Sequence, residues 1–307
     1  MTSIDTKPAA AWAPSHGKGV AIALGIAGAW SFSGLIFRSI EEAGSWETVF
    51  YRSIGVSFGV SLAVLLRHRG GTWQACRKIG RPGITAALCL CGGSLLFLHA
   101  LHFTTIANIT FVLAVSPFIA AALAWLLLRE TVTLRTWVAA AMALSGVGIM
   151  VFDELALGDA TGIFMALGTA TLMAGYAVSV RLGRNVDMTP AIALSGILAV
   201  LGSVLIISDF SISWHDLVLC LLQGAVISAA CNSLFAYAAR AVPAAELMLL
   251  GLIETVLAPT WVWLAIGEVP SLATVIGGAI ILVAVIGHAY STIWLPSRLV
   301  RAGPKPM

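Results

Sequence analysis

Charged residues are scarce in this chain. Asp, Glu, Lys and Arg make up only 10% of its 307 residues, whereas 59% are apolar, and its mean hydropathy is +0.98. Soluble domains carry about 25% charged residues and about 45–50% apolar residues, so a soluble enzyme is excluded. The net charge of +3 is small and forms no basic face, so nucleic acid is not an expected partner.

Several signatures of chemistry are missing as well. The chain has no HExxH motif and no nucleotide-binding loop, so zinc peptidase chemistry and direct use of ATP are not expected. Its five cysteines are odd in number and only Cys76 is expected in a loop, which argues against a disulfide framework. We predict no cofactor, no metal and no enzymatic activity, with an intramembrane enzyme as the least favoured alternative.

Long apolar runs are abundant instead. A hydrocarbon core of about 30 Å needs about 20 apolar residues per helix, and ten such runs cover most of the chain. The first run has no convincing cleavage site and nine more follow it, so it is expected to span the membrane rather than to be a signal peptide. The expected spans are Gly19 to Phe37, Val49 to Leu66, Pro82 to Phe103, Ile106 to Leu128, Thr136 to Phe152, Thr161 to Val180, Pro190 to Ile207, Leu217 to Ala239, Ala244 to Ile266, and Leu272 to Trp294.

Charge placement predicts the topology of these ten helices. Cytoplasmic loops are rich in Lys and Arg. With a cytoplasmic N-terminus, all of the 17 Lys and Arg residues except Arg38 and Arg52 fall on the cytoplasmic side. Most acidic residues fall on the other side, and an odd number of spans would mix the two sets. Residues 1–18 and 295–307 are therefore predicted to be cytoplasmic tails.

The chain also repeats itself. Shifted by 138 positions, residues 96–134 align without a gap on residues 234–272, with Phe97 on Phe235, Trp125 on Trp263 and Glu130 on Glu268. Each half, 19–152 and 161–294, holds five expected spans. Because five is odd, the two halves are predicted to be inverted relative to each other. Inverted repeats are typical of transporters that expose one central site to alternate sides.

The residues of this repeat carry a family resemblance. The segment 100–105 (ALHFTT), Ser116-Pro117, the segment 126–130 (LLLRE) and the segment 145–148 (SGVG) resemble the EamA family of the drug/metabolite transporter superfamily, and 252–259 with 266–268 repeat the theme. The resemblance covers nearly the whole chain and is closest to bacterial exporters of amino acids, particularly aromatic ones. It implies an exporter of the bacterial inner membrane that works by alternating access. The family's second-half motif usually has proline where this chain has Thr255.

Polar and aromatic residues inside the spans are the candidates for a central cavity, because unpaired polar groups are costly in hydrocarbon. Glu254 matches the family's acidic position and is a candidate for contact with substrate or a coupling proton, the alternative being a pairing with another helix. The other candidates share polar or aromatic character, in most cases at repeat-related positions, although such residues also hold helices together. They are Trp30, Ser33, Ser94, His99, Asn108, Tyr176, Ser179, Asn232 and Tyr237.

Other residues of the spans are given structural roles. Pro117 and Pro259 interrupt helical hydrogen bonding and are expected to act as hinges, with Pro259 compensating for Thr255. Glu246 is expected to cap its helix. Gly55 and Gly59 are expected to serve close packing within the bundle, so a monomer is favoured and a dimer is left open.

These observations predict a membrane exporter of small metabolites, most favourably of amino acids with aromatic or other neutral side chains. An efflux carrier for cationic drugs or another metabolite is the alternative. The expected partners are the small-molecule substrate and the lipid bilayer.

Overall fold

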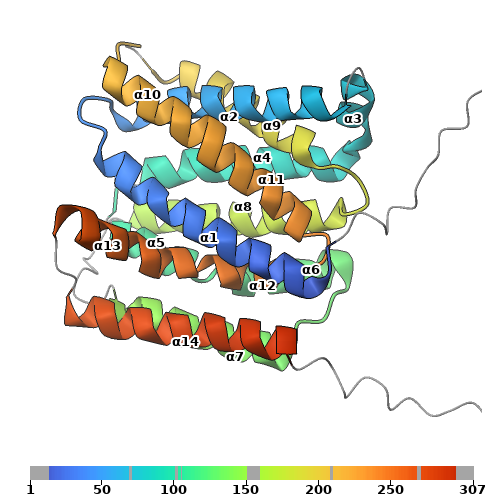
Figure 1. The fold of residues 1–307 in the computed structure, drawn as a ribbon, viewed down its shortest axis with the longest axis vertical. Coiled ribbons are helices and arrows are strands. Elements are labelled where there is room, and N and C mark those ends of the chain that lie inside the picture. Colours follow the sequence, from blue (N-terminus) through green and yellow to red (C-terminus); the bar gives the residue numbers. More distant parts are fainter. Residues whose placement is uncertain are drawn as a thin grey trace, which may run out of the picture.

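The computed structural model describes residues 14–68, 71–100, 103–104, 106–150, 160–207, 210–267 and 271–294 (Figure 1). Within these ranges the chain forms helices and no strand. The first half contains α1 (His16–Arg38), α2 (Ser45–His68), α3 (Thr72–Lys78), α4 (Gly80–Ala100), α5 (Ile106–Leu113), α6 (Ser116–Leu128) and α7 (Leu134–Met150). The second half contains α8 (Ala160–Leu182), α9 (Thr189–Val204), α10 (Trp214–Leu222), the π-helix η3 (Gln223–Ser228), α11 (Ala229–Ala238), α12 (Ala244–Gly251), α13 (Ile253–Ile266) and α14 (Leu272–Trp294).

The apolar runs of the sequence become these helices, with ends within about four residues of those expected. Seven segments are long and apolar enough to cross a membrane, and two shorter apolar helices, Leu134–Ile149 and Thr189–Val204, accompany them in the described part of the chain. The prediction of an all-helical, multi-pass membrane protein is confirmed. The short helix α3 was not predicted, and Cys76, expected in a loop, lies on it.

The contacts between helices are nearly unchanged when the two halves are exchanged. Helix α4 packs on α8, and its counterpart α11 packs on α1. Helix α6 packs on α8, and the corresponding interrupted pair, α12 and α13, packs on α1. Two further pairs, α2 with α9 and α7 with α14, each join equivalent helices of the two halves, and α6 of the first half also packs on α12 of the second. The halves are therefore interleaved around one shared interior, and α7 and α14 lie together along one edge (Figure 1).

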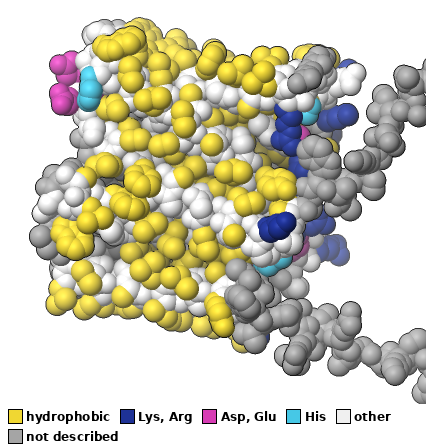
Figure 2. Space-filling model, in the orientation of Figure 1, with side chains coloured by type: hydrophobic (Ala, Val, Ile, Leu, Met, Phe, Trp, Pro, Cys, Tyr) yellow, Lys and Arg dark blue, Asp and Glu magenta, His cyan; other side chains and the backbone are white. Residues whose placement is uncertain are grey.

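The two ends of the bundle carry opposite charges (Figure 2). One end, called here the basic end, holds the start of α1, the end of α2 and the end of α8. Its cations are Lys18, Arg67, Arg77, Lys78, Arg81, Arg129, Arg135, Arg181, Arg184 and Arg240. The other end, called here the acidic end, holds the end of α1 and the starts of α2 and α10, with Glu41, Glu42, Glu47 and Asp216. The surface between them is dominated by apolar side chains (Figure 2).

Glycine allows the closest helix contacts inside the bundle. A Cβ at Gly224 of η3 would lie 2.1 Å from the Arg52 carbonyl oxygen of α2, and one at Gly59 would lie 2.6 Å from the Ala225 carbonyl oxygen. A Cβ at Gly146 of α7 would lie 2.8 Å from the Gly277 carbonyl oxygen of α14. Gly55 and Gly59 thus serve packing between helices of the same chain.

Candidate functional site

Two helix pairs are interrupted at equivalent residues, next to the shared interior. Helices α5 and α6 are separated at Ala114 and Val115, and α12 and α13 are separated at Leu252. Leu252 is the repeat partner of Ala114. Interrupted helices at corresponding positions of two repeats commonly mark the binding site of a transporter, because their exposed backbone ends are tolerated only beside a cavity or protein.

The causes of the two interruptions differ. In the first half, Pro117 in the first turn of α6 has no N–H to donate to the preceding turn. In the second half, Thr255 occupies the equivalent position, and both its hydroxyl and its backbone N–H donate to the Leu252 carbonyl. Helix α13 continues over Pro259, so the interruption lies seven residues before that proline. The side chain of Pro259 lies outside the described residues, and the hinge roles of both prolines stay predictions.

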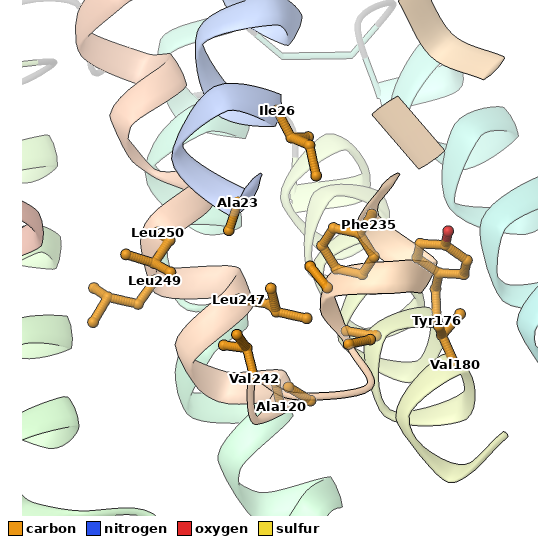
Figure 3. Packing of buried hydrophobic residues seen from close by; sticks show 14 of the residues in the cluster. Ala23, Ile26, Ala120, Tyr176, Val180, Phe235, Val242, Leu247, Leu249 and Leu250 are labelled. Carbon is orange, nitrogen blue, oxygen red and sulfur yellow. The ribbon is translucent and has the colours of Figure 1, made fainter. Parts of the chain in front are cut away.

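Three aromatic rings line the interior between α1, α8 and α11. Tyr176 stacks on Phe235 with ring centroids 5.4 Å apart. The ring centroid of Trp30 lies 6.2 Å from that of Phe235. Figure 3 shows Tyr176 and Phe235 side by side above Leu247 and Val180. Tyr176 is only 3% exposed, yet its hydroxyl has no hydrogen-bond partner among the described residues. Because a buried hydroxyl is costly when unpaired, this group is available to a ligand.

A chain of buried polar side chains crosses from α1 to α11 beside these rings. Gln223 Nε2 donates to Ser33 Oγ at 3.2 Å, Ser228 Oγ donates to Gln223 Oε1 at 3.2 Å, and Asn232 Nδ2 donates to the Ser228 carbonyl at 2.9 Å. The predicted residues Ser33 and Asn232 are therefore linked through Gln223 and Ser228, which the sequence analysis missed. Gln223 and Ser228 begin and end the π-helix, a local distortion that is frequent at functional sites.

The same contact recurs in the other half. Thr85 of α4 is the repeat partner of Gln223 at the offset of 138, and Ser179 of α8 is the repeat partner of Ser33 at an offset of 146, which relates the first helices of the two halves. The hydroxyl of Thr85 donates to Ser179 Oγ at 3.1 Å, as Gln223 donates to Ser33. The pairing of Thr85 with Gln223 was the signal in the sequence by which Gln223 could have been found.

Glu254 is the candidate carboxylate in the second half. It lies in the first turn of α13, where the helix dipole favours a negative charge. It is partly buried, it has no hydrogen bond or ion pair among the described residues, and its charge acts on Cys231 of α11, one turn before Phe235. Its repeat partner is Ser116 at the start of α6, which is buried.

The remaining predicted residues lie apart from this group or are not described. His99 packs between Trp46 and Phe103 at the acidic end of α4, with ring centroids 5.9 and 5.4 Å away. Tyr237 lies near the basic end, with the Arg240 guanidinium 5.9 Å from its ring centroid. Ser94 lies on α4 and is partly buried. The side chain of Asn108 lies outside the described residues.

Ion pairs close the bundle at its basic end. Among the described residues, every ion pair except the one between neighbouring His215 and Asp216 is found there. Arg181, at the end of α8, contacts Glu130 at 3.1 Å and donates to the carbonyls of Ala239 and Arg240 at 2.9 and 2.8 Å. One side chain thus ties α8 to the α6–α7 connection and to the α11–α12 turn.

Asp187 forms a second tie at this end, between the α8–α9 turn and α2. Its carboxylate contacts His68 at 3.1 Å and Arg67 at 3.5 Å. Burial opposes ionisation of this carboxyl, but the hydrogen bonds from Thr189 and the charge of Arg67 hold the pKa of Asp187 below its ordinary value.

Glu246 is not a helix cap, contrary to expectation. It lies in the first turn of α12 but makes no capping bond there. Its Oε1 instead lies 3.3 Å from His16 Nε2 on α1 and 3.2 Å from His288 Nε2 on α14. The carboxylate is therefore used to join three helices, which the sequence could not show because the partners lie far apart in the chain.

At the acidic end the ties are mostly hydrogen bonds to backbone groups. Asp216 of α10 is fully buried and accepts from the backbone N–H groups of Glu41, Glu42 and Ala43 at 2.9–3.2 Å. Tyr51 donates to the Phe210 carbonyl at 2.6 Å. Nearer this end than the basic end, Trp261 of α13 also donates to Ser31 of α1 at 2.7 Å and stacks on Phe32 with ring centroids 4.5 Å apart. Among the described residues, ion pairs therefore join the two halves at the basic end, whereas a hydrogen bond and a ring stack join them toward the acidic end.

These features define a class of protein. A multi-pass bundle of two interleaved halves, with interrupted helices and partnerless polar groups around one interior, is the architecture of a membrane transporter.

The comparison with protein families gives the same result. The pattern of the EamA-like transporter family matches twice, over residues 17–152 and 160–289. The chain belongs to this family, so it is a transporter and not an enzyme. The two matches are consistent with the internal repeat.

Known proteins resemble the chain at two levels. The uncharacterized transporter YwfM of Bacillus subtilis (strain 168) is 28% identical over 210 residues, which is 66% of this chain and 70% of the relative. One crystal structure, described without a protein name, superposes with a TM-score of 0.76 over 93% of this chain and 100% of its own. Its sequence identity of 20% means that this likeness concerns the fold alone.

Proposed function

We propose that this transporter exports amino acids with aromatic or other neutral side chains across a bacterial inner membrane by alternating access. The observation that carries the proposal is the carboxylate of Glu254, which has no partner among the described residues, on a helix that packs against α1, the helix that carries Trp30 beside the stacked rings of Tyr176 and Phe235. The side-chain ring of an aromatic amino acid would pack against these protein rings, and its ammonium group would pair with the Glu254 carboxylate.

The proposed membrane topology has ten helices in two inverted halves. The seven candidate spans, the two shorter apolar helices and α1 with its 23 residues make up this number over the described chain. The starts of α1 and α8 lie at opposite ends of the bundle (Figure 1), as inversion requires. Since cations favour the cytoplasmic side, the basic end and both termini are assigned to the cytoplasm.

The site offers a place for each part of a zwitterionic substrate. Glu254 would hold the ammonium group, and the start of α6 at Ser116, which has no acidic residue in its first turn, would favour the carboxylate through the helix dipole. The Tyr176 hydroxyl would gain the hydrogen bond that it lacks in the described structure. Because the basic end is fastened, release toward the acidic side is the step that this conformation serves.

Counterflow in sealed proteoliposomes tests the proposal. Vesicles containing the purified protein are loaded with one unlabelled amino acid and supplied with the same labelled amino acid outside, for each of the twenty, at two pH gradients. We expect labelled Phe and Trp to accumulate transiently and to be recovered chemically unchanged. Accumulation of a labelled cationic dye in the same vesicles, with Phe and Trp inert, would instead support the drug-efflux alternative.

Tyr176→Phe gives a second, independent test. Removal of an unpaired buried hydroxyl should leave the melting temperature unchanged or slightly raised. The same change should weaken counterflow by roughly tenfold, the loss of one hydrogen bond of about 1 kcal/mol or more. Phe235→Leu is the matched control, because it removes the stacked ring while Tyr176 keeps its hydroxyl. This change should lower the counterflow of aromatic substrates more than that of aliphatic ones.

A further inference from the structure

His16 lies between two groups that can only accept hydrogen bonds. Its Nε2 is 3.3 Å from Glu246 Oε1 and its Nδ1 is 3.2 Å from the Ala241 carbonyl oxygen. A neutral imidazole carries one N–H and one lone pair, whereas a protonated one carries two N–H groups. The 3.3 Å contact of Nε2 with Glu246 is an ion-pair contact and not a hydrogen bond. A neutral ring that donates from Nδ1 to the Ala241 carbonyl would turn the lone pair of Nε2 toward the carboxylate, so both contacts are favourable together only when the ring is protonated.

Because of the position of His16, its protonation affects a contact between the two halves. The residue begins α1 in the first half, and both of its partners belong to the α11–α12 turn and α12 in the second half. Arg181 of α8 binds the two preceding carbonyls of the same turn, those of Ala239 and Arg240. The end of α11 is thus held by two cations from the two halves, of which Arg181 is permanent and His16 can lose its charge.

The helices packed at this corner supply several charged groups. Helix α12 supplies Glu246, and α14 supplies His288, whose Nε2 lies 3.2 Å from the same carboxylate oxygen. Helix α8 supplies Arg181, which is paired with Glu130, and the turn itself supplies Arg240. The other titratable groups on these elements include Lys18 of α1, Tyr176 of α8, Cys231 and Tyr237 of α11, Tyr290 of α14 and, in the first turn of α13, Glu254; η3 contributes none.

Of the three groups that meet at the Glu246 carboxylate, His16 is the one that water can reach. Its side chain is 35% exposed, compared with 6% for Glu246 and 3% for His288. The contact with Glu246 raises the pKa of His16 above its ordinary value, and the Ala241 carbonyl adds to this, while burial and the charge of Arg181 act against it. A group with a raised pKa contributes its stabilisation below about pH 6.5 and loses it as the pH rises through the folded-state pKa.

We propose that His16 is a proton-binding site that latches the basic end, so that the bound proton holds α1 on the α11–α12 turn and its loss releases α1 and opens this end. The latch is a property of the closed basic end and does not depend on which substrate is carried. Only the assignment of this end to the cytoplasm rests on the proposed function. In that orientation a rising cytoplasmic pH opens the entrance through which an exporter loads its substrate.

A buried reporter beneath α1 can follow the latch. Val242 is fully buried, and a Cβ at Gly19 of α1 would lie 2.6 Å from its Cγ2, so a thiol introduced by Val242→Cys is accessible only when α1 moves away. Native Cys76 is exposed at the same end and serves as the internal reference for the effect of pH on thiol reactivity. The measurement is the ratio of maleimide labelling at these two sites in the full-length protein, resolved by peptide mass spectrometry, with no substrate present.

The expected result is a ratio that rises roughly tenfold between about pH 6 and about pH 9 in the reporter protein. In His16→Gln the ratio should be high at every pH, and in His16→Arg, which keeps a cation at the latch, it should be low at every pH. His68→Gln removes another histidine of the basic end and should keep the pH response. A flat ratio in the reporter protein, or an unchanged pH response in His16→Gln, would overturn the proposal.

The arginine variant keeps the test decisive if the glutamine variant does not fold, because a pH response that persists in His16→Arg contradicts the latch equally. Loss of amino acid counterflow with an intact labelling response would count against the proposed substrate and leave the latch standing.

Discussion

The first half of the molecule breaks its helix before Pro117 and places Ser116 at the start of α6, whereas the second half breaks its helix at Leu252 and places Glu254 at the start of α13. The backbone is interrupted at the same level in both halves, but only the second half carries a carboxylate there. The same holds at the basic end, where Glu246 of the second half has Asn108 as its repeat partner. Equivalent shapes allow the halves to exchange conformations, while ionisable groups in one half make the two end states respond differently to charge and pH.

The largest effect is expected from removing a cation of the basic end that only the second half carries. Arg181 has Leu35 as its repeat partner. In the proposed alternating access, in which the two halves exchange conformations, the ties of Arg181 therefore exist in only one of the two end states. Arg181→Ala should destabilise the protein by about 3 kcal/mol, because it leaves two carbonyls without their donor and leaves Glu130 with the more exposed Arg184 as its cation. The measurement is the unfolding midpoint in mixed SDS micelles.

Arg184→Ala is the matched control for that experiment. Arg184 contacts the same Glu130 oxygen at 3.2 Å, but its side chain is 46% exposed, so its loss should cost below about 1 kcal/mol. Equal losses in the two variants would mean that burial of the Arg181 ties does not matter.

A glycine in η3 makes the two halves differ in packing rather than in charge. Gly224 has Ala86 as its repeat partner, and Ala86 is fully buried on a regular helix. Gly224→Ala should cost about 1–3 kcal/mol, because the added Cβ would meet the Arg52 carbonyl of α2 and backbone would have to move. Gly287→Ala on α14, where no heavy atom lies near the added Cβ, should be neutral or stabilising by up to about 1 kcal/mol. If Gly224→Ala unfolds at the same SDS fraction as the original chain, the tight contact between α2 and η3 is not rigid.

The sequence predicted the fold well because length and hydropathy decide it. An apolar run of about 20 residues has one favourable fate in a bilayer, so the helix ends lie close to those expected. The short helix α3 escaped because seven residues in a charged loop show no such run. The π-helix also escaped, since it depends on the approach of α2 to Gly224 and not on local propensity.

The site was predicted only where the repeat made it visible. Trp30, Tyr176, Ser33 and Asn232 stood out as polar or aromatic partners across the halves, and the structure brings them to one interior. Phe235 was noticed as a marker of the repeat and not as a wall of the site. The ties of Glu246 lie 230 residues away at His16 and 42 residues away at His288, and no spacing rule connects such positions.

The carboxylate that distinguishes the second half can be neutralised at nearly constant shape. Glu254→Gln should lower counterflow of the proposed substrate by roughly tenfold, since a hydrogen bond to a charged group contributes about 1.5–3 kcal/mol. It should also change the pH dependence of transport. Ser116→Ala, at the equivalent position of the first half, should have a smaller effect and leave the pH profile intact. An unaltered profile in Glu254→Gln would remove this carboxylate from the mechanism.

The smallest expected effect concerns the interruptions themselves. Pro117→Ala restores the missing N–H in the first half and should slow transport severalfold while the protein still folds, because a continuous helix bends less readily. Pro259→Ala should slow transport less, since α13 already continues over this residue and the second interruption depends on Thr255. Thr255→Ala, which removes the hydroxyl bond to Leu252, should therefore resemble Pro117→Ala more than Pro259→Ala does. Counterflow rates at matched protein density decide the order, and unchanged rates in both Pro117→Ala and Thr255→Ala would mean that the two interruptions are not hinges.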